Sequence, residues 1–186
     1  ISDQIKDDAK DAIKNLKKVG VSKIAMLTGD NKKVAEKAAK ELGITDVFAE
    51  LLPQDKVSKI EILLDELKGS QRKVAFAGDG INDAPALAAA NVSAAMSDAS
   101  DIAKETADIT LRGADLTELV RLRKLSELLM ERINKNYRFI LTFNSSLLVL
   151  GLLGVLSPST SALLHNASTM MICAKSMTPL MDKDKE

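Results

Sequence analysis

Two short segments of this chain combine aspartate with glycine in a pattern suited to phosphate and metal chemistry. They are Thr28-Gly29-Asp30 and Gly78-Asp79-Gly80-Ile81-Asn82-Asp83-Ala84-Pro85. Glycines on both sides of Asp79 allow a sharp turn and a close approach to a ligand. Asp79 and Asp83 suit Mg²⁺, which prefers oxygen ligands together with phosphate. An isolated Gly-Asp-Gly is more simply a turn with a capping aspartate, but the full octapeptide and the matching Thr-Gly-Asp segment favour a metal site.

Other residues in these regions could bind a phosphoryl group. Thr28 offers a hydroxyl and Gly29 a backbone N–H at the start of a predicted helix, where anions bind readily. Lys56 follows Pro53-Gln54-Asp55 at another helix start, where a cation opposes the helix dipole. Exposure to solvent is the simple explanation for this lysine. Neutralisation of phosphate charge in a transition state is the functional one.

Alternating helices and strands are predicted to position these segments. Short apolar runs at residues 24–27, 47–49, 74–77, 92–96 and 109–111 predict strands, and the segments at 5–19, 31–42, 54–68, 83–90, 100–106 and 114–137 predict helices. Such alternation indicates an α/β fold with a parallel sheet covered on both faces. Ligands of these sheets bind at the carboxyl ends of the strands, so both Gly-Asp segments should lie on one edge.

Composition narrows the functional classes. The chain has 186 residues, 26 basic and 26 acidic, with zero net charge and a mean hydropathy of +0.00. One or two domains are expected at this length, and the charge balance gives no support for a nucleic-acid partner. The single cysteine, Cys173, excludes an intramolecular disulfide and a CxxC zinc site.

The zero average conceals a long uncharged segment. From Phe139 to Ala174 there is no Asp, Glu, Lys or Arg. Residues 139–156 and 160–180 are predicted to form two membrane helices joined by a turn at Ser157-Pro158-Ser159. Basic residues flank the pair, so both ends should be cytoplasmic. The alternative for residues 139–156 is a buried helix of a soluble protein.

One histidine lies within the second predicted membrane helix. His165, Ser168 and Thr169 are spaced i, i+3 and i+4, so they share a helical face. A lone histidine on an apolar helix is usually a hydrogen-bonded packing residue. Inside a membrane, however, ionisable residues are rare and tend to be functional, and imidazole binds transition metals.

Several of these motifs carry a resemblance to a known family. Residues 26–31 (Met-Leu-Thr-Gly-Asp-Asn), 53–56 (Pro-Gln-Asp-Lys) and 78–88 (GDGINDAPALA) resemble the phosphorylation domain of P-type cation pumps. Asp3-Gln4-Ile5-Lys6 is similar to that family's Asp-x-x-Arg hinge motif, and residues 94–111 resemble its heavy-metal branch. The resemblance implies a partial haloacid-dehalogenase-like (Rossmann-like) domain over residues 1–135, a transmembrane helix pair over 136–181 and a cytoplasmic tail over 182–186.

The resemblance also implies roles for individual residues. Asp79 would bind Mg²⁺ with support from Asp83, and Asp3 would take part in cofactor binding. The phosphoryl group would be held or contacted by Thr28, Gly29, Lys56 and Asn82, with Asp30 ordering the site. In the second part, His165 and the hydroxyls of Ser168 and Thr169 would bind the transported ion, with Asn144 facing the same site. Met170, Met171 and Cys173 add soft ligands, although packing is the more common role of such residues.

The resemblance is incomplete in one important respect. The family's nucleophile belongs to an Asp-Lys-Thr-Gly-Thr motif, and this sequence has none. Because that motif lies on a central strand, its absence should separate two halves of the sheet and leave unpaired edges. The chain is therefore expected to be part of an ATP-driven heavy-metal transporter and to be inactive alone.

Further expectations follow from that interpretation. Its cofactors would be Mg²⁺, ATP and a transition-metal cation, with zinc, cobalt, iron and manganese all open. Its partners would be the lipid bilayer and the missing N-terminal part of the pump, in the plasma membrane with the soluble domain in the cytoplasm. One alternative is a membrane-anchored phosphatase of the same superfamily, which would need its own nucleophilic aspartate. A non-catalytic membrane module is a third possibility, but it would leave the GDGINDAP segment without a purpose.

Overall fold

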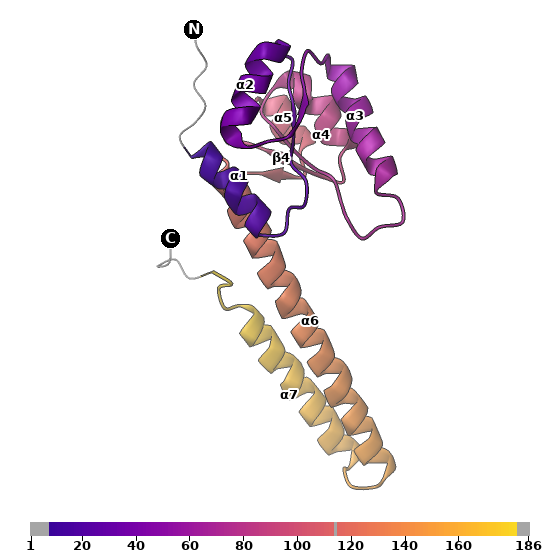
Figure 1. Ribbon diagram of the computed structural model, residues 1–186. Helices are drawn as coiled ribbons and strands as arrows, with labels where there is room; N and C mark the ends of the chain where they lie inside the picture. The colour runs from indigo at the N-terminus through magenta and orange to yellow at the C-terminus, as the bar shows by residue number, and fades with distance from the viewer. Residues whose placement is uncertain (1–7, 114, 182–186) are drawn as a thin grey trace. The chain divides into compact units, whose positions relative to one another are not determined.

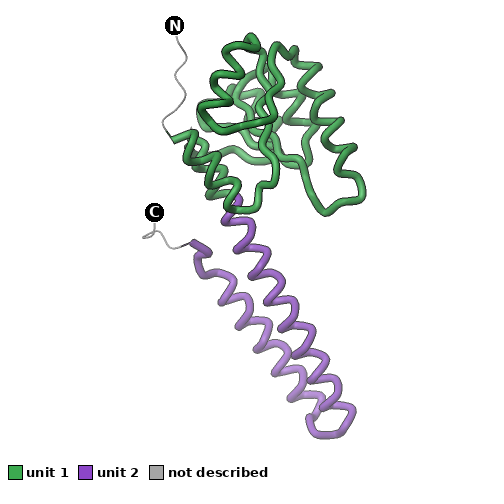
Figure 2. Tube along the Cα trace, in the orientation of Figure 1, with its two compact units in different colours: residues 1–122 green, residues 123–186 purple. Residues whose placement is uncertain are grey.

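The computed structural model describes residues 8–113 and 115–181. It divides into two compact units, residues 1–122 and residues 123–186 (Figure 2). The candidate cofactor residue Asp3, the first residues of the predicted helix 5–19 and the predicted tail 182–186 lie outside the described residues.

Unit 1 alternates helices and strands in the predicted order (Figure 1). Most bounds agree with the sequence prediction within one or two residues. The elements are α1 Ala9–Lys18, β1 Ala25–Leu27, α2 Lys32–Leu42, β2 Asp46–Phe48, α3 Pro53–Glu66, β3 Ala75–Gly78, the 3₁₀ turn η1 Ile81–Asp83, α4 Ala84–Ala89, β4 Val92–Ala95, α5 Asp101–Thr106 and β5 Ile109–Thr110.

Every strand pairing in the described residues is parallel, as predicted. The strands form two separate sheets, one with the order β1-β2 and one with the order β3-β4-β5. The expected division of the sheet is therefore confirmed. Since β1 and β3 are each bonded to one neighbouring strand, each keeps an edge that no described strand covers.

Local sequence explains where the helices of unit 1 begin and end. The side chain of Asn31 accepts a hydrogen bond from Val34 N at 3.0 Å and caps α2, which ends at Gly43 with a positive φ of 71°. Pro53 occupies the first turn of α3, where its missing N–H costs nothing. The side chain of Asp55 accepts from Leu52 N at 2.9 Å and completes the start of α3.

The core of unit 1 consists of small apolar clusters. One joins Ile13 of α1, Ala39 of α2 and Ile44 under β1 and β2. Two others lie around the second sheet, and their buried members are Leu87, Ala95, Ala99 and Ala103 in one and Ala94, Met96 and Leu111 in the other. The many alanines allow the helices to approach the strands closely, so the Gly-Asp segments sit on a tightly packed base.

Unit 2 is a helical hairpin built from most of α6 (Thr117–Leu152) and α7 (Pro158–Ser176) (Figure 1). The helix predicted over 114–137 and the apolar span predicted from residue 139 form one continuous helix, with Ala114 outside the described residues. That helix ends at Leu152, so the last four residues of the predicted span 139–156 lie in the turn. Gly154 adopts a φ of 71° there, and Ser157 caps α7 by accepting from Thr160 N at 3.2 Å.

The membrane prediction is not confirmed by these helices. Among the helices of the described residues, none is both long and apolar enough to cross a membrane. The pair of helices is present, and its transmembrane character stays a prediction.

Candidate functional site

The Thr28-Gly29-Asp30 loop follows β1, and hydrogen bonds between Thr28 and Asp30 stabilise its turn. Thr28 Oγ1 donates to Asp30 Oδ2 at 2.9 Å and accepts from Asp30 N at 3.1 Å. Thr28 N donates to Phe48 O at 2.9 Å, which ties the loop to β2. Asp30 is exposed and Thr28 is half-buried. The loop therefore presents an exposed turn with its backbone already fixed.

Lys56 and Asp83 form the most buried ion pair of the described residues. Lys56 Nζ lies 2.6 Å from Asp83 Oδ1, with side chains only 13% and 12% exposed. This finding excludes solvent exposure as the explanation for a lysine at the start of α3. The carboxylate offsets the unfavourable helix dipole, and a charge-assisted hydrogen bond is the strong kind.

Asp83 lies close to the glycines that precede it. Asp83 Oδ2 accepts from Gly80 N at 3.4 Å. A Cβ on Gly78 would lie 2.9 Å from Asp83 Cβ, closer than real contacts allow. Gly80 has an ordinary extended backbone, with φ −95° and ψ 157°. Glycine is therefore required at position 78 because Asp83 lies too close for a side chain there. At position 80 the backbone is one that any residue can adopt, so the expected need for a glycine turn is not observed.

Asp79 and Asn82 remain exposed on the same loop. Asp79 O accepts from Ser100 N at 2.9 Å, which ties the loop to the start of α5. Ser100 Oγ also accepts from Ala103 N at 3.3 Å and caps that helix. Within the described part of the chain, the Asp79 carboxylate has no hydrogen-bond partner, so its oxygens are open to a ligand.

The fit of Mg²⁺ to these residues depends on the two carboxylates. No group of three or more His, Cys, Asp and Glu side chains that could hold a metal occurs in residues 8–113 and 115–181. Mg²⁺ commonly uses one or two carboxylates and completes its shell with water and phosphate oxygens. Asp79 is open, whereas both oxygens of Asp83 accept hydrogen bonds. An open carboxylate at Asp79 is compatible with Mg²⁺ binding of this kind, whereas Asp83 is already engaged by Lys56 and Gly80.

In unit 2 the structure brings two of the predicted ion-site residues together. His165 Nδ1 lies 3.0 Å from Asn144 Oδ1. Because an amide oxygen only accepts, Nδ1 is the donor in this contact, and Nε2 is the ring nitrogen left for another partner. The hydroxyls of Ser168 and Thr169 instead donate to His165 O, at 2.8 and 3.0 Å. Their protons are thus engaged by the helix backbone, although their lone pairs remain.

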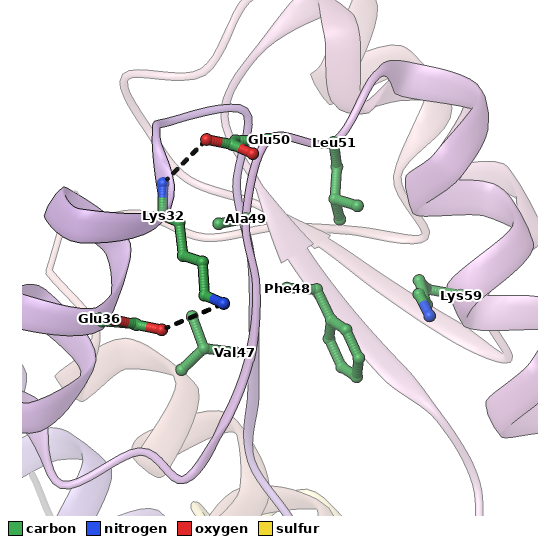
Figure 3. A pocket seen from close by; sticks show the side chains of 8 residues that line it. All are labelled: Lys32, Glu36, Val47, Phe48, Ala49, Glu50, Leu51 and Lys59. Atoms are coloured by element: carbon green, nitrogen blue, oxygen red, sulfur yellow. Dashed lines mark hydrogen bonds and ion pairs between the residues drawn. The ribbon is translucent and has the colours of Figure 1, made fainter.

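A pocket of about 330 Å³ lies beside β2 (Figure 3). It has an apolar floor and a charged rim, and Lys59 Nζ lies 4.7 Å from the centre of the Phe48 ring. None of the residues proposed from sequence lines it. Its lining residues are Lys32, Glu36, Val47, Phe48, Ala49, Glu50, Leu51 and Lys59.

Sequence reasoning missed two residues that hold the site loops. Ser100 bonds the carbonyl of Asp79, and its position before an acidic first turn is a recognisable capping signal. Glu50 bonds the carbonyl of Asp30 through its backbone N at 2.8 Å. No local pattern identifies Glu50, because its bond depends on how the chain turns after β2.

Comparison with known proteins supports the fold and the family. Residues 1–91 match the family model described as haloacid dehalogenase-like hydrolase. The zinc-exporting P-type ATPase of Mycobacterium marinum is 41% identical over 177 residues, 95% of this chain and 24% of that protein. The cadmium, zinc and cobalt-transporting ATPase of Bacillus subtilis is 38% identical over 100% of this chain and 26% of that protein. The chain thus spans about a quarter of the length of these relatives.

A solved structure gives the same result. The structure of a zinc-transporting PIB-type ATPase in the E2.Pi state superposes with a TM-score of 0.86 at 34% identity, covering 95% of this chain and 28% of that one. Fold and comparisons together define unit 1 as a haloacid-dehalogenase-like α/β domain. These proteins each match 95% or more of this chain, which is therefore similar to part of a heavy-metal P-type ATPase. The predicted resemblance to the heavy-metal P-type ATPases is confirmed.

Proposed function

We propose that this chain contributes part of the phosphorylation site and part of the metal path of an ATP-driven heavy-metal transporter. The observation that carries the proposal is the Lys56–Asp83 pair, 2.6 Å apart, beside the Gly-Asp loop of β3. Lys56 and Asp83 are nearly buried, and the exposed Asp79 lies on the same loop as Asp83. Together these residues form a site in which phosphate charge can be neutralised. Phosphoryl transfer needs mainly such positioning and neutralisation.

The proposal gives a role to the phosphate-binding and Mg²⁺-binding candidates of unit 1. Thr28 Oγ1 and the Gly29 N–H hold the phosphoryl oxygens. Without phosphate, Asp30 Oδ2 accepts the single Thr28 hydroxyl proton at 2.9 Å, so this bond opens when Thr28 donates to a phosphoryl oxygen. Lys56 neutralises phosphoryl charge, and Asn82 donates to the same group. Asp79 holds Mg²⁺, which supplies further neutralisation of phosphate charge when bound. The acceptor carboxylate and the ATP-binding residues lie outside this chain, which is therefore inactive alone.

Unit 2 supplies part of the transported-ion site in this proposal. Asn144 orients His165 through Nδ1 and leaves Nε2 to bind the ion, since a metal-binding histidine usually donates its other ring N–H to an oxygen acceptor. The matched relatives are named for zinc, manganese, copper or cadmium, zinc and cobalt. The ion is therefore left open within that group. The proposal places the part of α6 that follows residue 136, together with α7, in the plasma membrane and unit 1 in the cytoplasm, with the rest of the pump as partner.

The proposal is tested first on the 186-residue chain. We expect no phosphorylation by ATP and no hydrolysis of p-nitrophenyl phosphate. Mg²⁺-dependent hydrolysis would favour the alternative, a membrane-anchored phosphatase. That alternative needs a nucleophilic aspartate on a strand, whereas Asp8 immediately precedes helix α1.

A second test uses a longer pump that contains this chain. Asp79→Asn should abolish metal-stimulated ATPase activity, whereas the control Asp101→Asn, on exposed α5, should not. His165→Ala should remove stimulation by the transported metal, and Asn166→Ala should preserve it. Full metal stimulation in the His165 variant would exclude that residue from the ion site.

A further inference from the structure

The segment after β2 is fastened to the Thr28-Gly29-Asp30 loop by backbone hydrogen bonds. Glu50 N donates to Asp30 O at 2.8 Å, and Leu51 N donates to Thr28 O at 3.1 Å. Both bonds lie beyond the last residue of β2, so they are not part of the ladder between β1 and β2. Two consecutive N–H groups that follow β2, those of Glu50 and Leu51, therefore hold the Thr28-Gly29-Asp30 loop.

Glu50 adopts a strained conformation in order to make this connection. Its φ is 57°, and it is the one non-glycine residue with positive φ in the described chain. Such a conformation is uncommon for a residue with a side chain and persists where the surroundings require it. The left-handed turn at Glu50 directly follows β2. It lies where the N–H groups of Glu50 and Leu51 bond the carbonyls of Asp30 and Thr28.

The side chain of Glu50 makes a second connection to the same region. Glu50 Oε1 accepts from Lys32 N at 3.3 Å (Figure 3). Lys32 is the first residue of α2, so its N–H has no partner within the helix. The Lys32 side chain lies toward Glu36, 3.9 Å away, and takes no part in this bond. Glu50 thus holds the second half of the turn between β1 and α2, whereas Leu51 N holds the first half at Thr28 O.

We propose that Glu50 is a positioning residue for the phosphate loop Thr28-Gly29-Asp30. This inference rests on the proposed function of that loop. Glu50 acts through Asp30 O and Lys32 N, not by contact with phosphate, because a carboxylate would repel the anion. Its side chain is exposed, so its effect is local and does not depend on burial in the core.

Three substitutions separate the backbone contribution from that of the carboxylate. Glu50→Gln keeps an oxygen acceptor for Lys32 N. Glu50→Gly adopts positive φ easily but loses that acceptor, and Glu50→Val disfavours the left-handed turn itself. Glu61→Val, at an exposed position of α3, serves as the control for the loss of a surface glutamate.

Amide hydrogen exchange in the 186-residue chain is the first measurement. Glu50→Val should accelerate exchange at residues 50 and 51 on the order of tenfold, the effect of losing one net hydrogen bond. Glu50→Gly should accelerate exchange at Lys32 alone. Glu50→Gln and Glu61→Val should match the parent chain at all three amides. Unchanged exchange at residues 50 and 51 in Glu50→Val would overturn the proposal.

Phosphorylation by inorganic phosphate with Mg²⁺, in a longer pump, is the second measurement. Glu50→Val should raise the phosphate concentration for half-maximal phosphorylation about tenfold or more, because displaced catalytic groups lose much of their effect. Glu50→Gln should stay near the parent value, and apparent ATP affinity should not change. A purely structural defect would lower the maximum level without moving the half-maximal concentration, and that result would overturn the positioning role.

A Thr28→Ala arm separates this inference from the proposed function. If Thr28→Ala leaves phosphate affinity unchanged, the loop does not bind phosphate and the proposed function of the loop fails. The exchange data would then still decide whether Glu50 holds the loop. If Thr28→Ala weakens phosphate binding but Glu50→Val does not, only the positioning inference fails.

Discussion

Lys56 Nζ lies 2.6 Å from Asp83 Oδ1 although 27 residues separate the two in the chain. The contact joins the first turn of α3 to the short turn η1, and α3 and α4 lie side by side (Figure 1). It therefore couples the two sequence motifs Pro-Gln-Asp-Lys and GDGIND in one site. The pair also accounts for a cation near a helix N-terminus, where it would otherwise be disfavoured.

Removing one member of this pair should be costly. Lys56→Met leaves the Asp83 carboxylate 12% exposed and without its cation. We expect a loss on the order of 3 kcal/mol in the free energy of unfolding, as for other buried pairs that lose one partner. Urea unfolding of the 186-residue chain, followed by circular dichroism, measures the loss.

An exposed ion pair of the same length is the matched control. Lys68 Nζ lies 2.6 Å from Asp65 Oδ1, but the side chains are 77% and 67% exposed. Lys68→Met should change the free energy of unfolding by less than about 1 kcal/mol. Equal losses in the two variants would show that burial of the Lys56–Asp83 pair has no energetic consequence.

Glycine at position 78 should be required by steric contact. In Gly78→Ala the new Cβ would meet Asp83 Cβ at 2.9 Å and Phe76 Cε1 at 3.1 Å. We expect a destabilisation of about 1–3 kcal/mol from overpacking, with displacement of Asp83. Gly29→Ala is the control, since its nearest contact would be Leu51 O at 3.4 Å. Thermal unfolding that ranks the two variants in the opposite order would contradict this account.

Ser93 and Asp108 connect β4 to the residue before β5. Ser93 Oγ donates to Asp108 Oδ2 at 3.0 Å and accepts from Asp108 N at 3.0 Å, and Ser93 is 2% exposed. Ser93→Ala loses both bonds and should cost about 1–2 kcal/mol in chemical denaturation. Ser58→Ala, on the exposed face of α3, should cost close to nothing. A neutral Ser93→Ala would mean that water replaces the hydroxyl without penalty.

Arg132 should hold the C-terminal end of α7 against α6. Its guanidinium donates to the carbonyl of Ser176, the last residue of α7, and to those of Thr178 and Pro179 just beyond it, at 2.6–3.2 Å. Arg132→Ala should accelerate amide exchange in the last turn of α7. Lys135→Ala, whose partner Glu131 lies on the same helix, should not. Equal exchange in both variants would remove this role from Arg132.

Asp46 should titrate below the ordinary range for an aspartate. Hydrogen bonds from the Lys23 ammonium and then the Thr45 hydroxyl lower the pKa of its carboxyl. Because the folded pKa is depressed, the stabilisation is present above the ordinary pKa and is lost as pH falls through the folded value. NMR titration should show the pKa of Asp46 rising in Lys23→Met. An unchanged titration in that variant would rule out the lysine as the cause.

The local features of the fold could be predicted from sequence because their causes are local. Asn31, Gly43 and Pro53 mark helix ends through their own side chains or backbone preferences. Apolar runs between these signals identified the strands, and the Gly-Asp segments identified the loops that follow β1 and β3. The end of α6 was misplaced because residues 153–156 are as apolar as the helix before them, and only the turn at Gly154 separates them.

The sequence by itself determined the order of elements, the parallel strands, the resemblance to heavy-metal P-type ATPases and the residue types available for phosphate and metal chemistry. It also predicted the division of the sheet, because a strand that the chain lacks cannot pair. The tertiary structure alone decided which side chains meet. It paired Lys56 with Asp83, and it placed Glu50 in a left-handed turn beside the Thr28-Gly29-Asp30 loop. Such contacts depend on how elements distant in the chain pack, which no local pattern encodes.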